Sequence, residues 1–192
     1  MAERLTDDVG LQLLANAAAT VGVLYTIIVM FGPVSGAHFN PVVTLAEAVL
    51  GDRPWSDVAP YIAAQIAGGA VGAMIANLMF ELDPINVSAK VREGEGQFIG
   101  EIVATFGLVF LVFALVRSDR DRLVAGAVAA YIGGAYWFTS STSFANPAVT
   151  VTRTLSDTFA GIDPANAPMF VVMQLVGAGL AVAALRVIYP SD

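Results

Sequence analysis

Long apolar stretches separated by short polar turns dominate the chain. Five of them approach or reach the roughly 20 residues that a helix needs to cross the hydrocarbon core of a bilayer. They cover residues 9–31, 58–80, 98–116, 123–138, which runs on into polar 139–143, and 169–189. We therefore predict an all-α membrane protein with five full transmembrane helices.

Two shorter apolar runs, residues 41–50 and 147–155, each follow an Asn-Pro pair. Ten helical residues span about 15 Å, half of a bilayer core, so two such half-helices laid end to end would cross it once. Asparagine is a good helix cap, and proline fits the first helical turn. The pattern predicts two re-entrant half-helices.

The chain repeats itself. Residues 35–44 read Ser-Gly-Ala-His-Phe-Asn-Pro-Val-Val-Thr, and residues 141–150 read Ser-Thr-Ser-Phe-Ala-Asn-Pro-Ala-Val-Thr. The asparagines Asn40 and Asn146 are 106 positions apart, and the glutamines Gln65 and Gln174 that follow them are 109 apart. We interpret residues 1–192 as one membrane channel domain, with a first repeat over 1–95 and a second over 96–192.

The second repeat contains an odd number of crossings, so the two repeats should be inverted relative to one another. The apolar stretch 98–116 has no counterpart in the first repeat, because a shift of 106 positions moves it to the very start of the chain. The sequence thus predicts that the first of six helices is missing. Three explanations would each account for this: the true start lies upstream of Met1, the chain is a fragment, or a neighbouring subunit fills the missing wall of the bundle.

The two Asn-Pro pairs suggest a pore that favours neutral solutes. Half-helices that begin at the midplane direct two positive dipole ends at one point, which opposes cations. The amides of the asparagines would then bind the oxygen of a neutral solute. The predicted pore residues are Asn40, Pro41, Val42, Asn146, Pro147 and Ala148.

The composition agrees with a membrane protein and argues against several other functions. Apolar residues make up 57% of the chain and charged residues 13%, outside the soluble range. The net charge of −7 does not indicate nucleic-acid binding. The absence of cysteine excludes thiolate metal sites, the single histidine, His38, excludes a multi-histidine metal site, and we expect neither cofactor nor enzyme chemistry. Arg117, Arg120 and Arg122 place their turn in the cytoplasm.

These motifs resemble the aquaporin and aquaglyceroporin family, the major intrinsic proteins, over essentially the whole chain. Val42 stands where alanine is usual in the family's Asn-Pro-Ala box, and the second box, Asn146-Pro-Ala, is intact. Glu101-Ile-Val-Ala-Thr resembles the family's Glu-x-x-x-Thr element, and Gln65 and Gln174 match glutamines that support the re-entrant loops. The resemblance implies an aquaporin-like bundle in the cell membrane, usually a homotetramer with one pore in each subunit.

The resemblance also assigns the constriction. The family normally has an arginine directly after the second box, where this chain has Val149, and the family's spacing puts the other positions on Thr20, Gly134 and Ser143. Small, uncharged residues imply a wide filter that passes water and larger neutral solutes such as glycerol-like polyols. Residues 136–147 and 156–161 resemble short bacterial members associated with arsenic resistance, which favours metalloid hydroxides such as arsenous acid.

Three further polar residues have two interpretations each. Arg153, one turn after Val149, either faces the outer mouth, where it would concentrate anions, or reaches the interface beside Asp157. Glu101 either supports the second re-entrant loop or reaches water. His38 either braces the first loop or senses pH.

The rival to a conducting channel is a truncated, non-conducting fragment or a structural membrane subunit, because the missing helix would leave a wall of the pore open.

Overall fold

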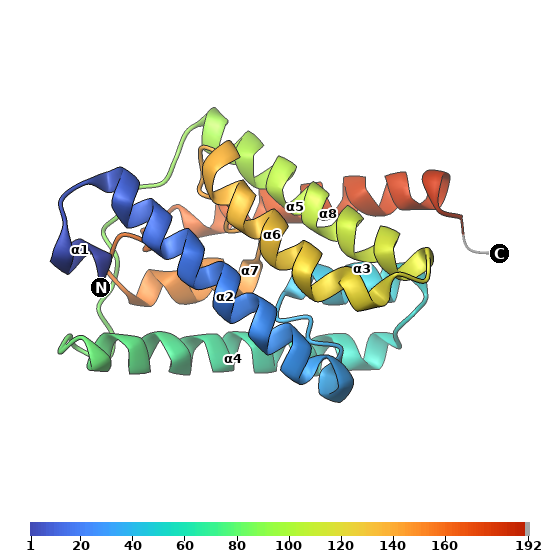
Figure 1. Ribbon diagram of the computed structural model, residues 1–192, viewed down its shortest axis with the longest axis horizontal. Helices are drawn as coiled ribbons and strands as arrows, with labels where there is room; N and C mark the ends of the chain where they lie inside the picture. The colour runs from blue at the N-terminus through green and yellow to red at the C-terminus, as the bar shows by residue number, and fades with distance from the viewer. Residues whose placement is uncertain (191–192) are drawn as a thin grey trace.

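The computed structural model describes residues 1–190, and that part of the chain is helical without strands. The helical segments are α1 (Ala2–Leu5), α2 (Val9–Ser35), α3 (Pro41–Leu50), α4 (Trp55–Met79), α5 (Glu95–Arg117), η1 (Asp121–Leu123), α6 (Val124–Phe138), α7 (Pro147–Thr152), η2 (Arg153–Leu155) and α8 (Ala167–Ile188). Figure 1 shows the long helices running roughly along one axis, with the N-terminus and the C-terminal end of α8 at opposite ends of the bundle.

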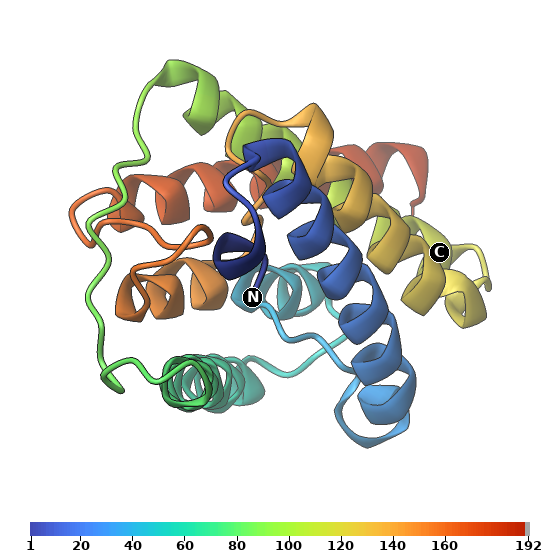
Figure 2. The ribbon, with the colours of Figure 1, turned by 60° about the vertical axis from the view of Figure 1, so that its left-hand side comes forward.

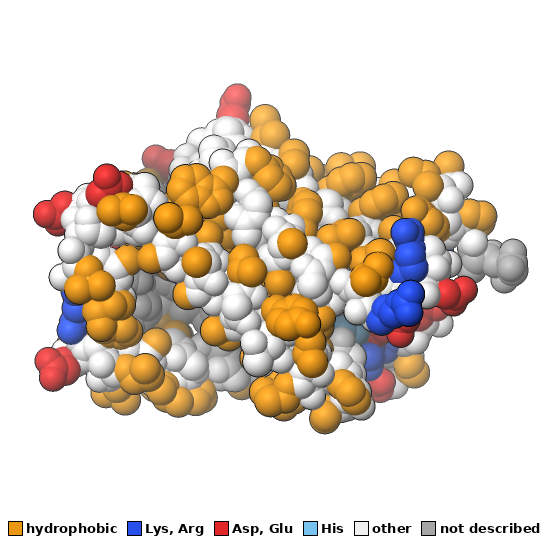
Figure 3. All heavy atoms as spheres, in the orientation of Figure 1, with side chains coloured by type: hydrophobic (Ala, Val, Ile, Leu, Met, Phe, Trp, Pro, Cys, Tyr) orange, Lys and Arg blue, Asp and Glu red, His pale blue; other side chains and the backbone are white. Residues whose placement is uncertain are grey.

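Four helices, α2, α4, α5 and α8, are long and apolar enough to cross a membrane. Helix α6 covers the predicted stretch 123–138 except its first residue, but its 15 residues are fewer than the roughly 20 that a membrane span needs. On the face in Figure 3, apolar side chains cover the middle of the bundle and charged ones gather at its two ends. This distribution matches a multi-pass membrane protein.

Local sequence explains where the helices begin. Asp8 caps α2 by accepting a hydrogen bond from Leu11 N at 3.0 Å. Asparagine and proline open both short helices, as predicted. Helix α3 covers the predicted residues 41–50, whereas the helix predicted over 147–155 is an α-helix only to Thr152 and then tightens into η2.

Helix packing is unequal in the two halves of the chain. Helix α5 lies closely against α8, and α2 against α6. Helix α4 contacts the short helices α3 and α7 instead of a long neighbour, and Figure 2 shows it apart from the other long helices. A groove of about 680 Å³ lies between α2, α4 and α7.

We name the two ends of the bundle by the predicted orientation. The inner end carries the turn 118–123, and the outer end carries the segments 81–94 and 156–166. These two outer segments meet, because Asn86 and Ser156 form a β-bridge and Lys90 O accepts from Asp163 N at 2.8 Å.

Candidate functional site

The two Asn-Pro pairs meet in the middle of the bundle and bind each other's loop. Asn40 accepts from Val42 N at 3.1 Å and donates from Nδ2 to Ala145 O at 2.8 Å. Asn146 accepts from Ala148 N at 2.9 Å and donates from Nδ2 to Phe39 O at 2.8 Å. Each amide group has two N–H bonds, so each asparagine retains one donor for a solute.

The loops before the two asparagines have the same unusual backbone. Ala37 and Phe39 have φ values of +50° and +49°, and Ser143 and Ala145 have values of +52° and +47°. These are corresponding positions of the two repeats, and non-glycine residues rarely adopt this region. Such loops need outside support to hold their shape.

Glu101 supplies that support to the second loop. Its side chain is fully buried in α5, and its two carboxylate oxygens accept from Phe144 N and Ala145 N, each at 2.9 Å. Gln174 Nε2 donates to the same carboxylate at 2.6 Å and lies 2.8 Å from Thr150 Oγ1. This geometry matches the supporting role expected of Glu101 and Gln174.

The first loop is held differently. Gln65 Nε2 donates to Thr44 Oγ1 at 3.1 Å, in the way that Gln174 contacts Thr150. His38 Nδ1 lies 3.0 Å from the same hydroxyl, and its Nε2 lies 3.3 Å from Glu47 Oε2. Glu47 is also in contact with Arg53. These contacts match the bracing interpretation of His38.

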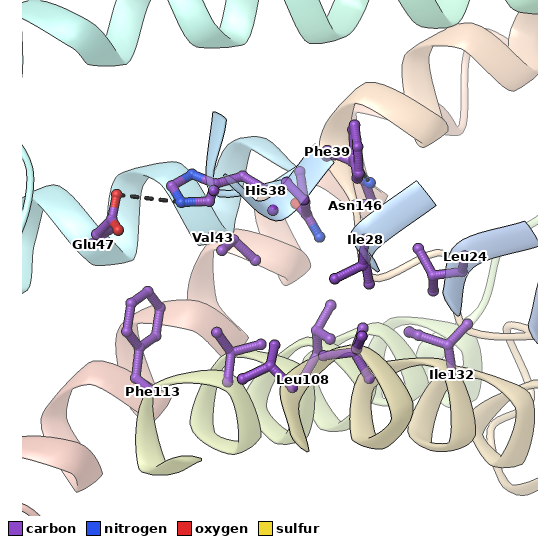
Figure 4. A pocket seen from close by; sticks show the side chains of 18 of the residues that line it. Leu24, Ile28, His38, Phe39, Val43, Glu47, Leu108, Phe113, Ile132 and Asn146 are labelled. Carbon is purple, nitrogen blue, oxygen red and sulfur yellow. Dashed lines mark hydrogen bonds and ion pairs between the residues drawn. The ribbon is translucent and has the colours of Figure 1, made fainter. Parts of the chain in front are cut away.

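A cavity of about 760 Å³ passes the two asparagines. It runs from Asp52 and Arg122 at the inner end to Arg153 at the outer end. Figure 4 shows that its walls differ: His38, Glu47 and Asn146 lie on one side, and apolar side chains such as Leu108 and Ile132 lie opposite. A lumen lined by both polar and apolar side chains suits solutes that carry both kinds of surface.

Three of the four predicted constriction residues line this cavity, namely Thr20, Ser143 and Val149. Gly134 does not belong to the lining and is exposed on α6, which corrects that assignment. The assignment of Gly134 depends on the assumed length of the loop before α6, which sets which residues of that helix face the pore. In the structure, α6 presents Tyr136 to the cavity. The hydroxyls of Tyr136 and Thr20 lie 3.2 Å apart.

Ser143 carries a free hydroxyl. Its side chain is buried, and its Oγ has no hydrogen-bond partner among residues 1–190. A buried hydroxyl that lines a cavity without a protein partner is available to a solute.

We expect Ser143→Ala to reduce flux of a polyol by about fivefold, the value of one ordinary hydrogen bond, while protein stability stays unchanged. Stopped-flow light scattering on proteoliposomes measures the flux. Ser140→Ala is the matched control, because Ser140 is exposed and donates to Gly96 O away from the cavity. Equal flux in both variants would remove Ser143 from the solute path.

Arg153 faces the cavity rather than the interface. Its Nη2 donates to Tyr136 Oη at 3.0 Å, and its guanidinium carbon lies 4.3 Å from the ring centre of Phe144. The Nη1 atom is buried and has no partner within the described part of the chain. Asp157, the alternative neighbour, instead accepts from Ala89 N at 3.0 Å.

Arg92 does not line the cavity but lies next to its lining residue Phe144, a position that the sequence analysis did not predict. It comes from the outer segment 81–94, and its side chain is only 6% exposed. It donates from Nε to Gly161 O at 2.7 Å and from Nη2 to Phe159 O at 3.1 Å. The only sequence signal was a basic residue in a connecting segment, which usually indicates a solvated loop.

The sequence model of the family described as "Major intrinsic protein" matches residues 2–143. Aquaglyceroporin AqpS of Rhizobium meliloti (strain 1021) is 47% identical over 186 residues, which cover 97% of this chain and 79% of that protein.

More distant relatives match a shorter part. Aquaporin NIP3-1 of Arabidopsis thaliana is 34% identical over 117 residues, covering 56% of this chain and 36% of the plant protein. The glycerol uptake facilitator protein of Streptococcus pneumoniae (strain ATCC BAA-255 / R6) is 35% identical over 100 residues, covering 46% of this chain and 43% of that protein. The chain thus spans less than half the length of these two relatives.

Proposed function

The chain belongs to the major intrinsic protein family, and from that premise we propose that it is a passive membrane channel for small neutral solutes rather than an enzyme. The observation that carries the proposal is the pair of asparagines that line one cavity, each with one amide N–H unused by the protein. Two donors at one point of the lumen orient a hydroxylated solute by its oxygen atoms.

The solute range follows from the constriction. Thr20, Ser143 and Val149 are small and uncharged, so the gap should admit polyols and metalloid hydroxides as well as water. Relatives named aquaglyceroporin and glycerol uptake facilitator support polyols. Arsenous acid, a neutral trihydroxide of similar size, is the further solute we propose.

The test is stopped-flow light scattering on proteoliposomes of the whole chain, challenged with water, glycerol and arsenous acid gradients. We expect flux of all three above that of empty liposomes. Water flux alone would refute the wide filter. No flux in any gradient would favour the rival, a non-conducting fragment or structural subunit.

We further propose that the groove between α2 and α4 is the place of a sixth span, as the repeat predicts. In the second repeat, α5 approaches α8 so closely that a Cβ on Gly177 would lie 2.5 Å from Ile102 O. The corresponding Gly68 lines the groove, and a Cβ there would meet nothing within 4 Å among the described residues.

Hydrogen bonding supports the same assignment. Phe144 N and Ala145 N donate to Glu101, whereas the corresponding N–H groups of His38 and Phe39 have no hydrogen bond within residues 1–190. A sixth span with a carboxylate in the position of Glu101 would satisfy them. Flux should therefore rise when such a span, encoded upstream or supplied by a neighbour, is added, and unchanged flux would contradict this.

We propose a homotetramer in the cell membrane, with one pore in each subunit and the two repeats, 1–95 and 96–192, inverted around it. Native mass spectrometry of the detergent-solubilised protein would detect four copies, and a monomer would refute that arrangement.

A further inference from the structure

We propose that Arg92 and Arg153 together form an electrostatic barrier at the outer end of the cavity that excludes protons and other cations. This inference rests on the proposed channel function. It assigns a role to Arg92, which comes from the outer segment 81–94 near the end of the first repeat and lies outside both Asn-Pro regions.

The position of Arg92 is fixed by the outer loops. Its guanidinium donates to carbonyl oxygens of the segment 156–166 and also from Nη1 to Ser141 O at 3.3 Å. Arg92 N donates to Asn166 Oδ1 at 2.9 Å, which holds the backbone as well. A charge held by this many neutral acceptors cannot swing away into solvent.

Phe144 links the two arginines to the cavity. It lines the cavity, and the guanidinium carbons of Arg92 and Arg153 lie 4.8 Å and 4.3 Å from its ring centre. Both charges are therefore close to the same stretch of the lumen, just behind and beside one wall residue.

The pair remains positively charged at neutral pH. Burial and, to a smaller extent, the charge of Arg153 lower the pKa of Arg92 to about 10, which still leaves it protonated. Glu101 is the acidic group that acts on Arg92, and its two oxygens are already taken by backbone N–H groups and Gln174. Two cations against one carboxylate leave a net positive charge.

The positive charges of Arg92 and Arg153 lie near a constriction whose own residues carry no charge. Thr20, Ser143 and Val149 are neutral, so nothing among them repels a cation entering from the outer end. A buried charge acts through a lower effective dielectric constant than a surface charge and is less screened by salt. Neutral solutes experience no such repulsion, so a barrier of this kind leaves the proposed transport intact.

The experiment compares charge-removing and charge-keeping variants. Proteoliposomes carrying a pH-sensitive dye report proton leak under a potassium diffusion potential, and glycerol flux on the same preparation reports the amount of working channel. We expect Arg92→Gln to raise the ratio of proton leak to glycerol flux on the order of tenfold, as expected for loss of one nearby charge. Arg92→Lys, which keeps the charge but not the fork of donors, should leave that ratio near its original value.

Arg153→Gln should raise the same ratio, and Arg92→Gln with Arg153→Gln should raise it further than either. Arg120→Gln is the matched control, because Arg120 is exposed at the inner end. Equal leak in Arg92→Lys and Arg92→Gln would show that Arg92 only holds the loops, and unchanged leak in Arg92→Gln would overturn the barrier. Absence of glycerol flux in the unmodified chain would refute the channel function instead.

Discussion

Glu101→Ala should abolish solute flux and lower the thermal stability of the protein. The substitution leaves Phe144 N, Ala145 N and one amide N–H of Gln174 without their acceptor inside the bundle. Each buried unpaired donor costs about 1–3 kcal/mol, so the total loss should exceed about 3 kcal/mol. The released loop carries three residues with positive φ, Thr142, Ser143 and Ala145, and it would keep only weaker support such as the hydrogen bond from Asn40 Nδ2 to Ala145 O.

Two measurements check this result: glycerol flux in proteoliposomes and the unfolding midpoint in detergent. Glu101→Gln should give a glycerol flux and an unfolding midpoint between those of Glu101→Ala and the unmodified protein. Its carbonyl oxygen still accepts a hydrogen bond, whereas its amide group faces other donors. Glu93→Gln is the matched control, since Glu93 is exposed two residues before α5. An Ala variant with the original midpoint and flux would show that the loop keeps its shape without the carboxylate.

The parts of this site that the sequence predicts well are local in origin. Asparagine followed by proline sets a helix start through contacts within a few residues, so the beginnings of α3 and α7 follow directly from the sequence. Glu101 could be singled out because an acid within an apolar stretch requires a partner. Its actual partners, two backbone N–H groups more than forty positions away, follow from the fold and the resemblance rather than from the pattern.

The sequence predicts less well where the outcome depends on register or on long connections. Gly134 was placed by counting through a turn of assumed length, and one helical residue turns a side chain by about 100°, enough to move it off the lumen. Arg92 could not be found, because its site is made by carbonyl oxygens of residues 159 and 161, brought together only by packing of the outer loops. Helix α6, by contrast, ends at Phe138 as the apolar pattern predicts, because Thr139 is extended where the polar run 139–143 begins.

The constriction has Val149 where the family normally has an arginine, and introducing that arginine should narrow the pore. Val149→Arg should reduce glycerol and arsenous acid flux by at least about tenfold while water still passes. Val149 lines the cavity together with Thr20 and Ser143, so a guanidinium there would fill the gap between them. Water is small enough to pass a narrow gap lined by donors, whereas a polyol is not.

Separate variants distinguish bulk from charge at this position. Val149→Met adds a long side chain without charge or donors, so it should lower glycerol flux less than arginine does. Val149→Ala, the matched control, leaves the gap at least as wide and should keep the glycerol-to-water ratio. Stopped-flow light scattering with each solute on the same vesicles gives that ratio directly. If Val149→Arg kept the original ratio, Val149 would lie beside the solute path rather than in it, and the solute range would have to be set by Thr20, Ser143 and Tyr136.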